Sequence, residues 1–174
     1  AQKEQWPVTF AGVIANHSAA KGLDFARSQG IPAYAIEHKE HATRESFDAA
    51  LIQQIDALGA DLVVLAGFMR ILTPGFIRHF EGRLINIHPA LLPKYGGKGM
   101  YGMHIHHAVV ENNEKETGIT IHFVNENYDE GNIIFQQQVL LAATDSPEHV
   151  AEKIHELEQE FFPLVIEKLL TNNL

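Results

Sequence analysis

The chain has 174 residues, the length of one ordinary domain, and 45 % of them are hydrophobic, which is enough for a core and excludes a disordered protein. Its 13 Lys and Arg against 22 Asp and Glu give a formal net charge of −9, which argues against broad nucleic-acid binding because that requires a basic face. The chain contains no cysteine, so disulfides, thiolate metal sites and a cysteine nucleophile are excluded.

Four short apolar runs in the first half of the sequence predict buried strands. The third run is continuously apolar from Leu62 onwards, the pattern of a parallel strand that is covered on both faces. The four runs are residues 8–15, 33–36, 61–66 and 83–87.

Helices are predicted between these strands. Residues 16–18 are polar and offer caps for a helix that runs to about Gln29, and residues 44–58 place apolar side chains at helical spacing. A short helix begins at Thr73-Pro74. This alternation of strand and helix indicates right-handed crossovers and an open parallel sheet.

The second half of the chain predicts an antiparallel addition to that sheet. Residues 88–103 form a loop rich in glycine and proline, and a short helix follows near residues 106–111. Strands at 120–124 and 133–141 flank residues 125–132, as in a long hairpin.

A last helix is predicted from Asp145-Ser146-Pro147 to about Leu170, because proline favours the first helical position. Pro163 lies within this helix and is expected to kink it or end it midway. The sequence has no internal repeat, low-complexity tract or linker, so we expect residues 1–174 to form a single domain.

One glycine-rich segment gives a weak signal for phosphate binding. Doubly wound sheets usually open with a strand, a glycine-rich turn and a helix whose N-terminus binds phosphate, but here Asn16-His17-Ser18 follows the first strand. Gly96-Gly97-Lys98-Gly99 is rich in glycine but does not follow a strand. We therefore interpret this segment as a flexible loop.

The strongest local feature is Asn86-Ile87-His88-Pro89 at the end of a predicted strand. Side chains alternate along a strand, so Asn86 and His88 point to the same side, at the carboxyl edge where open α/β sheets bind ligands. A carboxamide beside an imidazole suits acyl transfer, in which the amide stabilises an oxyanion and the imidazole moves a proton. A polar strand end without a catalytic role is equally compatible with the spacing.

Asp129 is a second candidate for the same chemistry. It lies in the loop after the strand at 120–124, on which Thr120 and His122 face the same way. A carboxylate near an imidazole orients it and raises its pKa. Spacing alone does not bring Asp129 to His88, and by itself an acidic surface turn is the simpler interpretation.

Metal and membrane functions are not favoured. His104, His106 and His107 invite a metal site, but no carboxylate or further histidine stands cleanly at the usual spacing, and we expect no metal. The longest apolar run, residues 62–69, is far shorter than the roughly 20 residues of a membrane helix. We expect a cytoplasmic protein that binds neither membrane nor nucleic acid.

Three long stretches resemble the phosphoribosylglycinamide formyltransferases, which belong to the formyl transferase fold family. They are residues 62–72, 86–95 and 118–131. The resemblance extends from about Val8 to the final helix. It implies an α/β fold with an open, mostly parallel, twisted sheet of Rossmann-like type and helices on both faces.

The resemblance also implies a reaction of de novo purine biosynthesis. In that reaction the amine of glycinamide ribonucleotide attacks the formyl carbon of the co-substrate 10-formyltetrahydrofolate, and no metal is needed. Asn86 matches the asparagine of the family that stabilises the oxyanion, and His88 matches the histidine that transfers a proton. Asp129 matches the aspartate that orients this histidine and stabilises its charge.

Further residues match positions at which the family contacts its substrates. The folate positions implied by the resemblance are Arg44, Met69, Arg70, Ile71, Leu72, Asn86, Val124, Asn125 and Glu126. The ribonucleotide positions are His155 and Glu158.

The sequence departs from the family at three places. Family members begin with a strand and a phosphate-binding loop that precede the first strand here, so we expect the chain to be N-terminally incomplete relative to the family. Ala90 stands where a serine is common, and Gly96 replaces a common proline. Residues 98–102 resemble an insertion, which we expect to reshape the mouth of the substrate site.

Alternative functions stay open at this point. A formyltetrahydrofolate deformylase would use water in place of the amine, and a methionyl-tRNA formyltransferase needs a further domain and a basic surface. A folate- or nucleotide-binding protein without catalysis is the third alternative, which the presence of Asn86, His88 and Asp129 together disfavours. The sequence gives no indication of the oligomeric state.

Overall fold

The computed structural model describes residues 7–171, which form two compact units. The N-terminal unit contains the described residues up to Asp61 together with Ile71–His79. The C-terminal unit contains Leu62–Arg70 and the described residues from Phe80 onwards. The α/β architecture expected from the sequence is confirmed, whereas the single domain stays a prediction.

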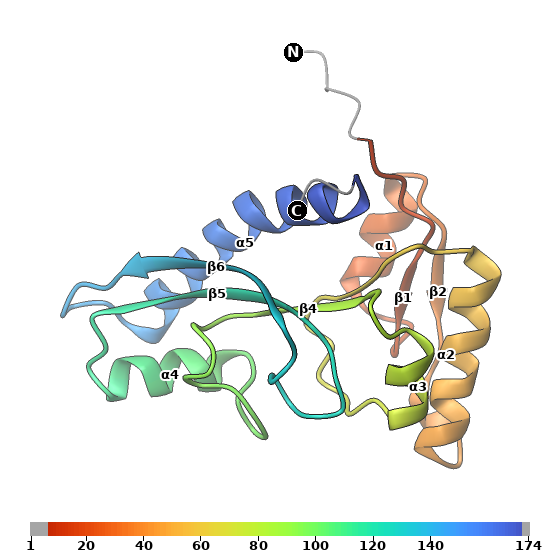
Figure 1. Cartoon of the computed structure of the whole chain (residues 1–174), viewed down its shortest axis with the longest axis horizontal. Coiled ribbons are helices and arrows are strands. Elements are labelled where there is room, and N and C mark those ends of the chain that lie inside the picture. Colours follow the sequence, from red (N-terminus) through yellow and green to blue (C-terminus); the bar gives the residue numbers. More distant parts are fainter. Residues whose placement is uncertain (1–6, 172–174) are drawn as a thin grey trace. The chain divides into compact units, whose positions relative to one another are not determined.

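The N-terminal unit combines a short parallel sheet with helices (Figure 1). Strand β1 pairs in parallel with β2, which places Ile14 opposite Tyr34. The elements are β1 (Val13–Ala15), α1 (Lys21–Ser28), β2 (Ala33–Ala35), the 3-10 helix η1 (His38–Glu40), α2 (Arg44–Leu58) and α3 (Pro74–His79).

Helix α2 has the bounds predicted from the sequence because both of its ends are capped. The hydroxyl of Thr43 accepts a hydrogen bond from the backbone of Ser46 at 3.1 Å, and the Ser46 side chain in turn caps the backbone of Thr43. Gly59 ends the helix in the left-handed conformation, with φ 62°. Three residues of the predicted apolar face are buried, namely Phe47, Leu51 and Ile55.

The first strand and the first helix are shorter than predicted. Strand β1 begins at Val13 rather than near residue 8, and α1 begins after Ala20, whose side chain forms no cap. The polar residues expected to cap the helix form a turn instead. The backbone of Ala19 donates to the imidazole of His17 at 3.0 Å, and the backbone of Ser18 donates to the Glu37 carboxylate at 2.8 Å.

The C-terminal unit is built on a four-stranded sheet in the order β3-β4-β5-β6 (Figure 1). The pairing of β3 with β4 is parallel, and the β4–β5 and β5–β6 pairings are antiparallel, which confirms the predicted antiparallel addition. Helices α4 and α5 pack against each other, and α5 also contacts β5 and β6. The elements are β3 (Val63–Leu65), β4 (Leu84–His88), α4 (Met103–Glu111), β5 (Glu116–Phe123), β6 (Ile133–Leu140) and α5 (Pro147–Leu170).

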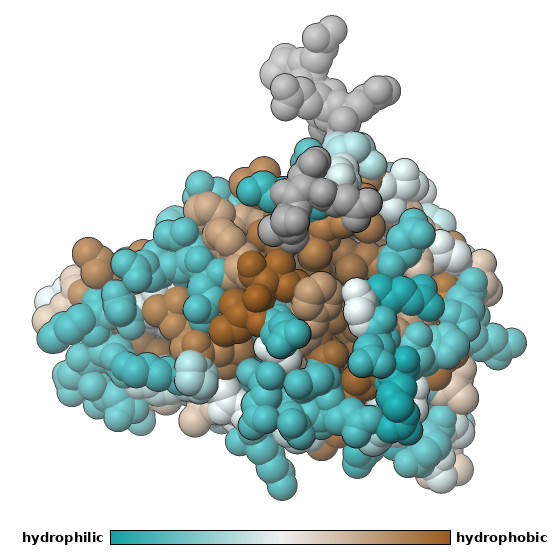
Figure 2. All heavy atoms as spheres, in the orientation of Figure 1, coloured by the Kyte–Doolittle hydropathy of each residue, from teal (hydrophilic) through white to brown (hydrophobic). Residues whose placement is uncertain are grey.

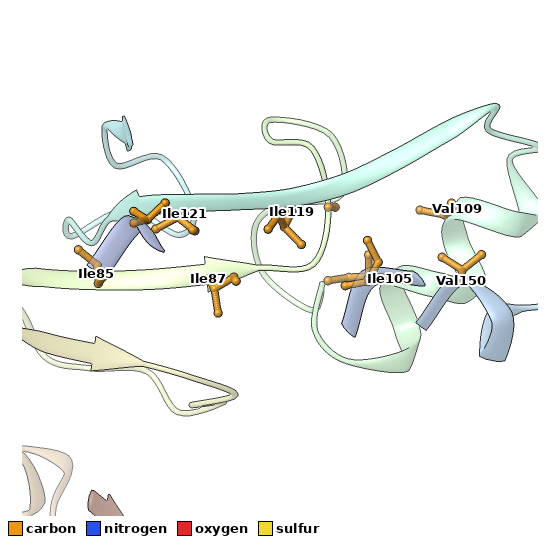
Figure 3. Close-up of a cluster of buried hydrophobic side chains, with 10 residues drawn as sticks. Ile85, Ile87, Ile105, Val109, Ile119, Ile121 and Val150 are labelled. Carbon is orange, nitrogen blue, oxygen red and sulfur yellow. The ribbon is translucent and has the colours of Figure 1, made fainter. Parts of the chain in front are cut away.

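The core of the C-terminal unit lies between one face of this sheet and the two helices. Figure 3 shows isoleucines of β4 and β5 together with Ile105 and Val109 of α4 and Val150 of α5. Alternation along β4 places Ile85 and Ile87 in this core. The side chains between and after them point to the opposite face, where the candidate site lies.

Strand β3 does not have the coverage predicted from its continuous apolar run. Val64 is 37 % exposed, so this strand is not buried on both faces. Among the described residues β3 pairs only with β4, and it is therefore an edge strand of its sheet.

Helix α5 begins as predicted and continues through its internal proline. The hydroxyl of Ser146 accepts from the backbone of His149 at 3.3 Å, and Pro147 occupies the first turn. Pro163 does not end the helix, because residues beyond it, such as Val165, are buried in the core. Leu164, in the C-terminal half of α5, is exposed. Figure 2 shows hydrophobic side chains at the surface near the middle of the view. No helix in the described part of the chain is long and apolar enough to cross a membrane.

Candidate active site

The site is built on the ends of two antiparallel strands. Asn86 and His88 of β4 lie on the face opposite the apolar core, as their spacing predicts. The register of the β4–β5 ladder places Asn86 opposite His122, and His88 opposite Thr120. Four polar side chains from two strands therefore share one face of the sheet.

His122 orients the carboxamide of Asn86. The Nδ1 atom of His122 donates to the carbonyl oxygen of Phe123 at 2.9 Å, because a carbonyl can only accept. Its Nε2 atom is then the acceptor for the Nδ2 amide of Asn86 at 3.2 Å. An amide carries two N–H groups, so this bond leaves the second N–H of Asn86 free to donate elsewhere.

The imidazole of His88 is buried, hydrogen-bonded at Nε2 and near a carboxylate at Nδ1. Its Nε2 atom donates to the carbonyl oxygen of Tyr95 at 2.8 Å, and its Nδ1 atom lies 3.7 Å from Oδ1 of Asp129. Burial lowers the pKa of His88 below its usual value, although the negative charge of Asp129 and the Tyr95 hydrogen bond act in the opposite direction. His88 is thereby favoured as a neutral base whose lone pair is on Nδ1.

Asp129 brings a carboxylate to both imidazoles. Its Oδ1 atom lies 3.7 Å from Nδ1 of His88 and 3.7 Å from Nε2 of His122. Its Oδ2 atom accepts a hydrogen bond from the backbone of Gly97 at 2.8 Å. The glycine-rich segment considered for phosphate binding thus donates a backbone N–H to an acidic side chain of the chain itself.

Two glycine residues allow the loops of the site to approach neighbouring atoms closely. Gly131 ends the loop that carries Asp129, and a Cβ atom there would lie 1.6 Å from the carbonyl oxygen of Phe123. At Gly96 a Cβ atom would lie 2.6 Å from the Leu92 side chain and 3.3 Å from Cβ of Asp129. Larger side chains at these two positions would force the loops away from the imidazoles.

The other predicted substrate-binding residues are distributed over both units. Arg44 is exposed at the start of α2 in the N-terminal unit, and Leu72 is buried in the same unit. Among the remaining predicted folate contacts, Val124 is half-buried and the others are exposed. The exposed residues are Met69, Arg70, Ile71, Asn125 and Glu126. The backbone of Val124 donates to the carbonyl of Leu84 at 2.9 Å, which ties the start of the Asp129 loop to β4.

The two predicted ribonucleotide residues face each other on α5. His155 Nδ1 lies 3.5 Å from Oε2 of Glu158, and His155 Nε2 lies 2.7 Å from the amide of Gln159. Burial raises the pKa of Glu158, and the neighbouring His155 opposes this change. This pair is a separate polar feature, on an element other than the two strands of the site.

The three histidines considered for a metal lie on α4. His106 is buried, and His104 packs edge-on against the ring of Tyr101. Within residues 7–171 no group of three or more histidine, aspartate or glutamate side chains has the arrangement of a metal site.

His122 is the member of the site that the sequence prediction did not include. The sequence indicated that His122 and Thr120 face the same way, but only the register between β4 and β5 places His122 opposite Asn86. A carboxamide with a free N–H, a neutral imidazole and a carboxylate at its side make a site suited to acyl transfer to an amine.

Comparison with known proteins agrees with this chemistry. Residues 1–166 match the sequence model of the family described as formyl transferase. A phosphoribosylglycinamide formyltransferase of Escherichia coli K12 is 42 % identical over 158 residues, which cover 91 % of this chain and 72 % of that relative. A trifunctional purine biosynthetic protein adenosine-3 of Drosophila melanogaster is also 42 % identical over 158 residues, but this chain covers only 11 % of it.

Solved structures give the same result. The phosphoribosylglycinamide formyltransferase of Coxiella burnetii, solved in complex with CHES, superposes with a TM-score of 0.87 and is 36 % identical. The superposition covers 94 % of this chain and 74 % of that one. A phosphoribosylglycinamide formyltransferase of Bacillus halodurans has the same TM-score at 35 % identity, with coverage of 95 % and 83 %.

Proposed function

The chain belongs to the formyl transferase family, and we propose that it transfers the formyl group of 10-formyltetrahydrofolate to the amine of glycinamide ribonucleotide in de novo purine biosynthesis. The observation that carries this proposal is the convergence of Asn86, His88 and Asp129 in a chain 42 % identical to a phosphoribosylglycinamide formyltransferase. A cytoplasmic location and folate as the formyl carrier are parts of the same proposal.

Asn86 stabilises the negative charge that develops in the transition state. Attack of the amine on the formyl carbon places negative charge on the formyl oxygen. One N–H of Asn86 donates to His122, which fixes the amide plane, and the other N–H is available to the oxyanion. Loss of one such donor typically lowers kcat about 10²- to 10³-fold.

His88 removes the proton from the attacking nitrogen, which becomes positively charged on attack. Its Nδ1 lone pair accepts a proton from the ammonium that forms on attack, and the resulting imidazolium faces the Asp129 carboxylate. When the tetrahedral intermediate collapses, the proton goes to the folate nitrogen as its bond to the formyl carbon breaks. The formylated ribonucleotide and tetrahydrofolate are the products.

The substrate contacts are assigned by resemblance and are tested residue by residue. We assign folate to Arg44, the segment 69–72, Asn86 and the segment 124–126, and the ribonucleotide to His155 and Glu158. Glu158 fits this role chemically, because burial raises its pKa and hydrogen bonds from ribose hydroxyl groups would stabilise the buried carboxylate.

A single assay tests the function. The protein is mixed with glycinamide ribonucleotide and 10-formyltetrahydrofolate, and the absorbance change of the folate is followed. We expect tetrahydrofolate to appear only when the ribonucleotide is present. Appearance without the ribonucleotide would instead identify a deformylase, and binding of either substrate without turnover would identify a non-catalytic binding protein.

His88→Ala provides the matched test of the mechanism. We expect kcat to fall at least about 10²-fold, within the range of lost general base catalysis, while circular dichroism shows that the protein stays folded. Near-normal turnover in this variant would remove His88 from the mechanism. Arg78→Ala, on the exposed side of α3, serves as the control for handling and purity.

A further inference from the structure

Tyr95 connects the reacting imidazole to a carboxylate outside the site. Its carbonyl oxygen accepts the Nε2 proton of His88 at 2.8 Å. At its other end the phenol donates to Oε1 of Glu114 at 3.0 Å. Glu114 contacts none of the residues placed in the catalytic step, so its connection to His88 runs through the length of Tyr95.

The backbone of Tyr95 is held in an unfavourable conformation. Its φ of 56° lies in the left-handed region, which side chains larger than glycine rarely adopt. Only a residue fixed at other points keeps such a conformation. The carbonyl that points at His88 depends on this backbone angle, and the phenol held by Glu114 is a second polar point at which Tyr95 is fixed.

Glu114 is itself fixed to the frame of the C-terminal unit. Its backbone donates to the carbonyl of Val109 at the end of α4, at 3.2 Å, and it lies two residues before β5. Its carboxylate also accepts from Nζ of Lys94 at 3.1 and 3.2 Å. These hydrogen bonds keep the pKa of Glu114 below its usual value, so the carboxylate is available as an acceptor at neutral pH.

An open hollow of about 280 Å³ borders the same residues. Lys94, Tyr95 and Glu114 are among its lining residues, together with Leu91, Glu116 and Thr117. A phenol released from Glu114 therefore has space into which the ring can turn. The ring of Tyr95 packs partly against the core of the C-terminal unit, and at its far end the phenol is fixed by the hydrogen bond to Glu114.

We propose that Glu114 is a positioning residue for the reaction: it holds the Tyr95 phenol, and the Tyr95 carbonyl keeps the His88 proton on Nε2 and so leaves Nδ1 to accept the proton of the amine. The inference rests on the proposed function, because it assigns Glu114 to the same site. Without this anchor the Tyr95 carbonyl turns away, the Nε2 proton loses its acceptor, and both tautomers of His88 become populated.

Kinetics of three variants test the proposal. Tyr95→Phe removes one oxygen atom and Glu114→Ala removes its acceptor, and each is expected to lower kcat about tenfold with less than a twofold change in either KM. Glu114→Gln retains an acceptor for the phenol and is expected to recover kcat to within about threefold. Glu116→Gln changes another carboxylate that borders the same hollow and is the control with unchanged activity.

The second readout reports the imidazole directly. Histidine ¹⁵N NMR of the full chain assigns the tautomer of His88, and we expect Nε2–H in the wild-type protein and a mixture in Tyr95→Phe and Glu114→Ala. The acid limb of kcat/KM is also expected at lower pH in these two variants, because the Tyr95 hydrogen bond raises the pKa of His88. A merely structural role of Glu114 would move neither quantity.

The outcomes separate this inference from the proposed function. An unchanged tautomer and an unchanged pH profile in a folded Tyr95→Phe protein would overturn the inference, even if activity fell. Absence of formyl transfer in the wild-type protein would overturn the proposed function, while the NMR experiment would still show whether Glu114 controls the tautomer. If Glu114→Ala does not fold, Tyr95→Phe alone decides.

Discussion

Burial and two neighbouring groups act in opposite directions on the imidazole of His88. Desolvation lowers its pKa, and the Asp129 carboxylate and the Tyr95 carbonyl raise it by a smaller amount. The result is a base that stays neutral at physiological pH and still has a carboxylate in place for the moment at which it becomes charged. The same group is thus suited both to accept the proton and to hold it.

The pH dependence of activity follows from this balance. The neutral form of His88 is the active base, and its pKa lies below 6.5, so kcat/KM is expected to be full above this range and to fall as pH drops through the folded pKa. Asp129→Asn removes a group that raises this pKa, and the acid limb is therefore expected to move to lower pH, with a lower maximal rate. The measurement is kcat/KM against pH from 4.5 to 9.

Glu130→Gln is the matched control for this prediction. It removes an exposed carboxylate from the adjacent position of the same loop without touching an imidazole. The midpoint of its acid limb is expected to stay where it is in the wild-type protein. A shift of the Asp129→Asn midpoint to higher pH would contradict the assigned electrostatic role of Asp129.

The sequence predicts individual site residues where local geometry decides. Asn86 and His88 share a face because strand periodicity requires it. Asp129 and His122 enter the site through the register of β4 with β5 and through the course of a loop. The spacing of the residues does not bring either side chain to His88. Asp129 was a candidate because it is a carboxylate in the following loop, and only the family resemblance gave it a role beside His88.

At the scale of elements, β5 supports the loop that follows the catalytic strand. The hydroxyl of Thr120, which is fully buried, donates to the carbonyl of Ala90 at 2.7 Å. It accepts from the backbone of Leu92 at 3.0 Å and from the amide of Gln136 at 2.9 Å. One side chain thus joins the loop to both strands of the hairpin.

Thr120→Val is expected to destabilise the protein by about 2–4 kcal/mol. The substitution keeps the shape but leaves the buried N–H of Leu92 and carbonyl of Ala90 without this partner, and each such group costs about 1–3 kcal/mol. Chemical denaturation measures the change. Thr117→Val, at a buried position of the same strand outside this network, is the control and is expected to change stability by less than about 1 kcal/mol.

Gly131→Ala is expected to separate the Asp129 loop from the catalytic strands. The added methyl would lie 1.6 Å from the backbone oxygen of Phe123, which cannot move without breaking the ladder. We expect kcat to fall about tenfold or more and the free energy of unfolding to fall by about 1–3 kcal/mol. In contrast, Gly22→Ala adds a methyl in open space on helix α1 and is expected to stabilise by up to about 1 kcal/mol. Equal behaviour of the two variants would argue against close approach at Gly131.

Elements were predictable where their ends carry local signals. Ser146-Pro147 defines the start of α5, and α2, predicted from its apolar spacing, begins at the Thr43–Ser46 cap and ends at Gly59. The start of α1 was wrong because its polar residues found turn partners, including a carboxylate 19 positions away. Pro163 does not end α5, one of the two outcomes expected of it, since burial of residues beyond it outweighs the loss of one helical hydrogen bond.

At the scale of the whole molecule, the order of strands and helices along the chain predicts the fold class better than it predicts which elements pack together. The alternating first half and the hairpin of the second half were correctly predicted as an α/β arrangement with an antiparallel addition. The contact between α4 and α5 was not predicted from the sequence, because Val109 and Val150 are separated by about forty residues of chain (Figure 3). Hydrophobic periodicity identifies the face that each helix buries but not the partner that covers it.

The change of the free energy of unfolding with pH depends on the histidines that the fold buries. His88 and His106 are both buried, and burial lowers the pKa of each; the nearby charge of His107 lowers that of His106 further. Because the unfolded chain binds protons at these groups more readily, the free energy of unfolding is expected to fall as pH drops below 6.5. Glu158, whose pKa is raised, acts in the opposite sense.

His106→Leu isolates this effect from catalysis. Nδ1 of His106 is buried without a hydrogen-bond partner, so leucine at this position loses no bond at that atom and removes a group that must be protonated at low pH. We expect the variant to equal or exceed the wild-type protein in stability at pH 7 and to lose less stability between pH 7 and pH 5, as measured by urea denaturation at each pH. His104→Leu, at an exposed position on the same helix, is expected to leave the pH slope unchanged. A steeper loss in His106→Leu than in the wild-type protein would mean that the protonated imidazole of His106 finds a partner in the folded chain.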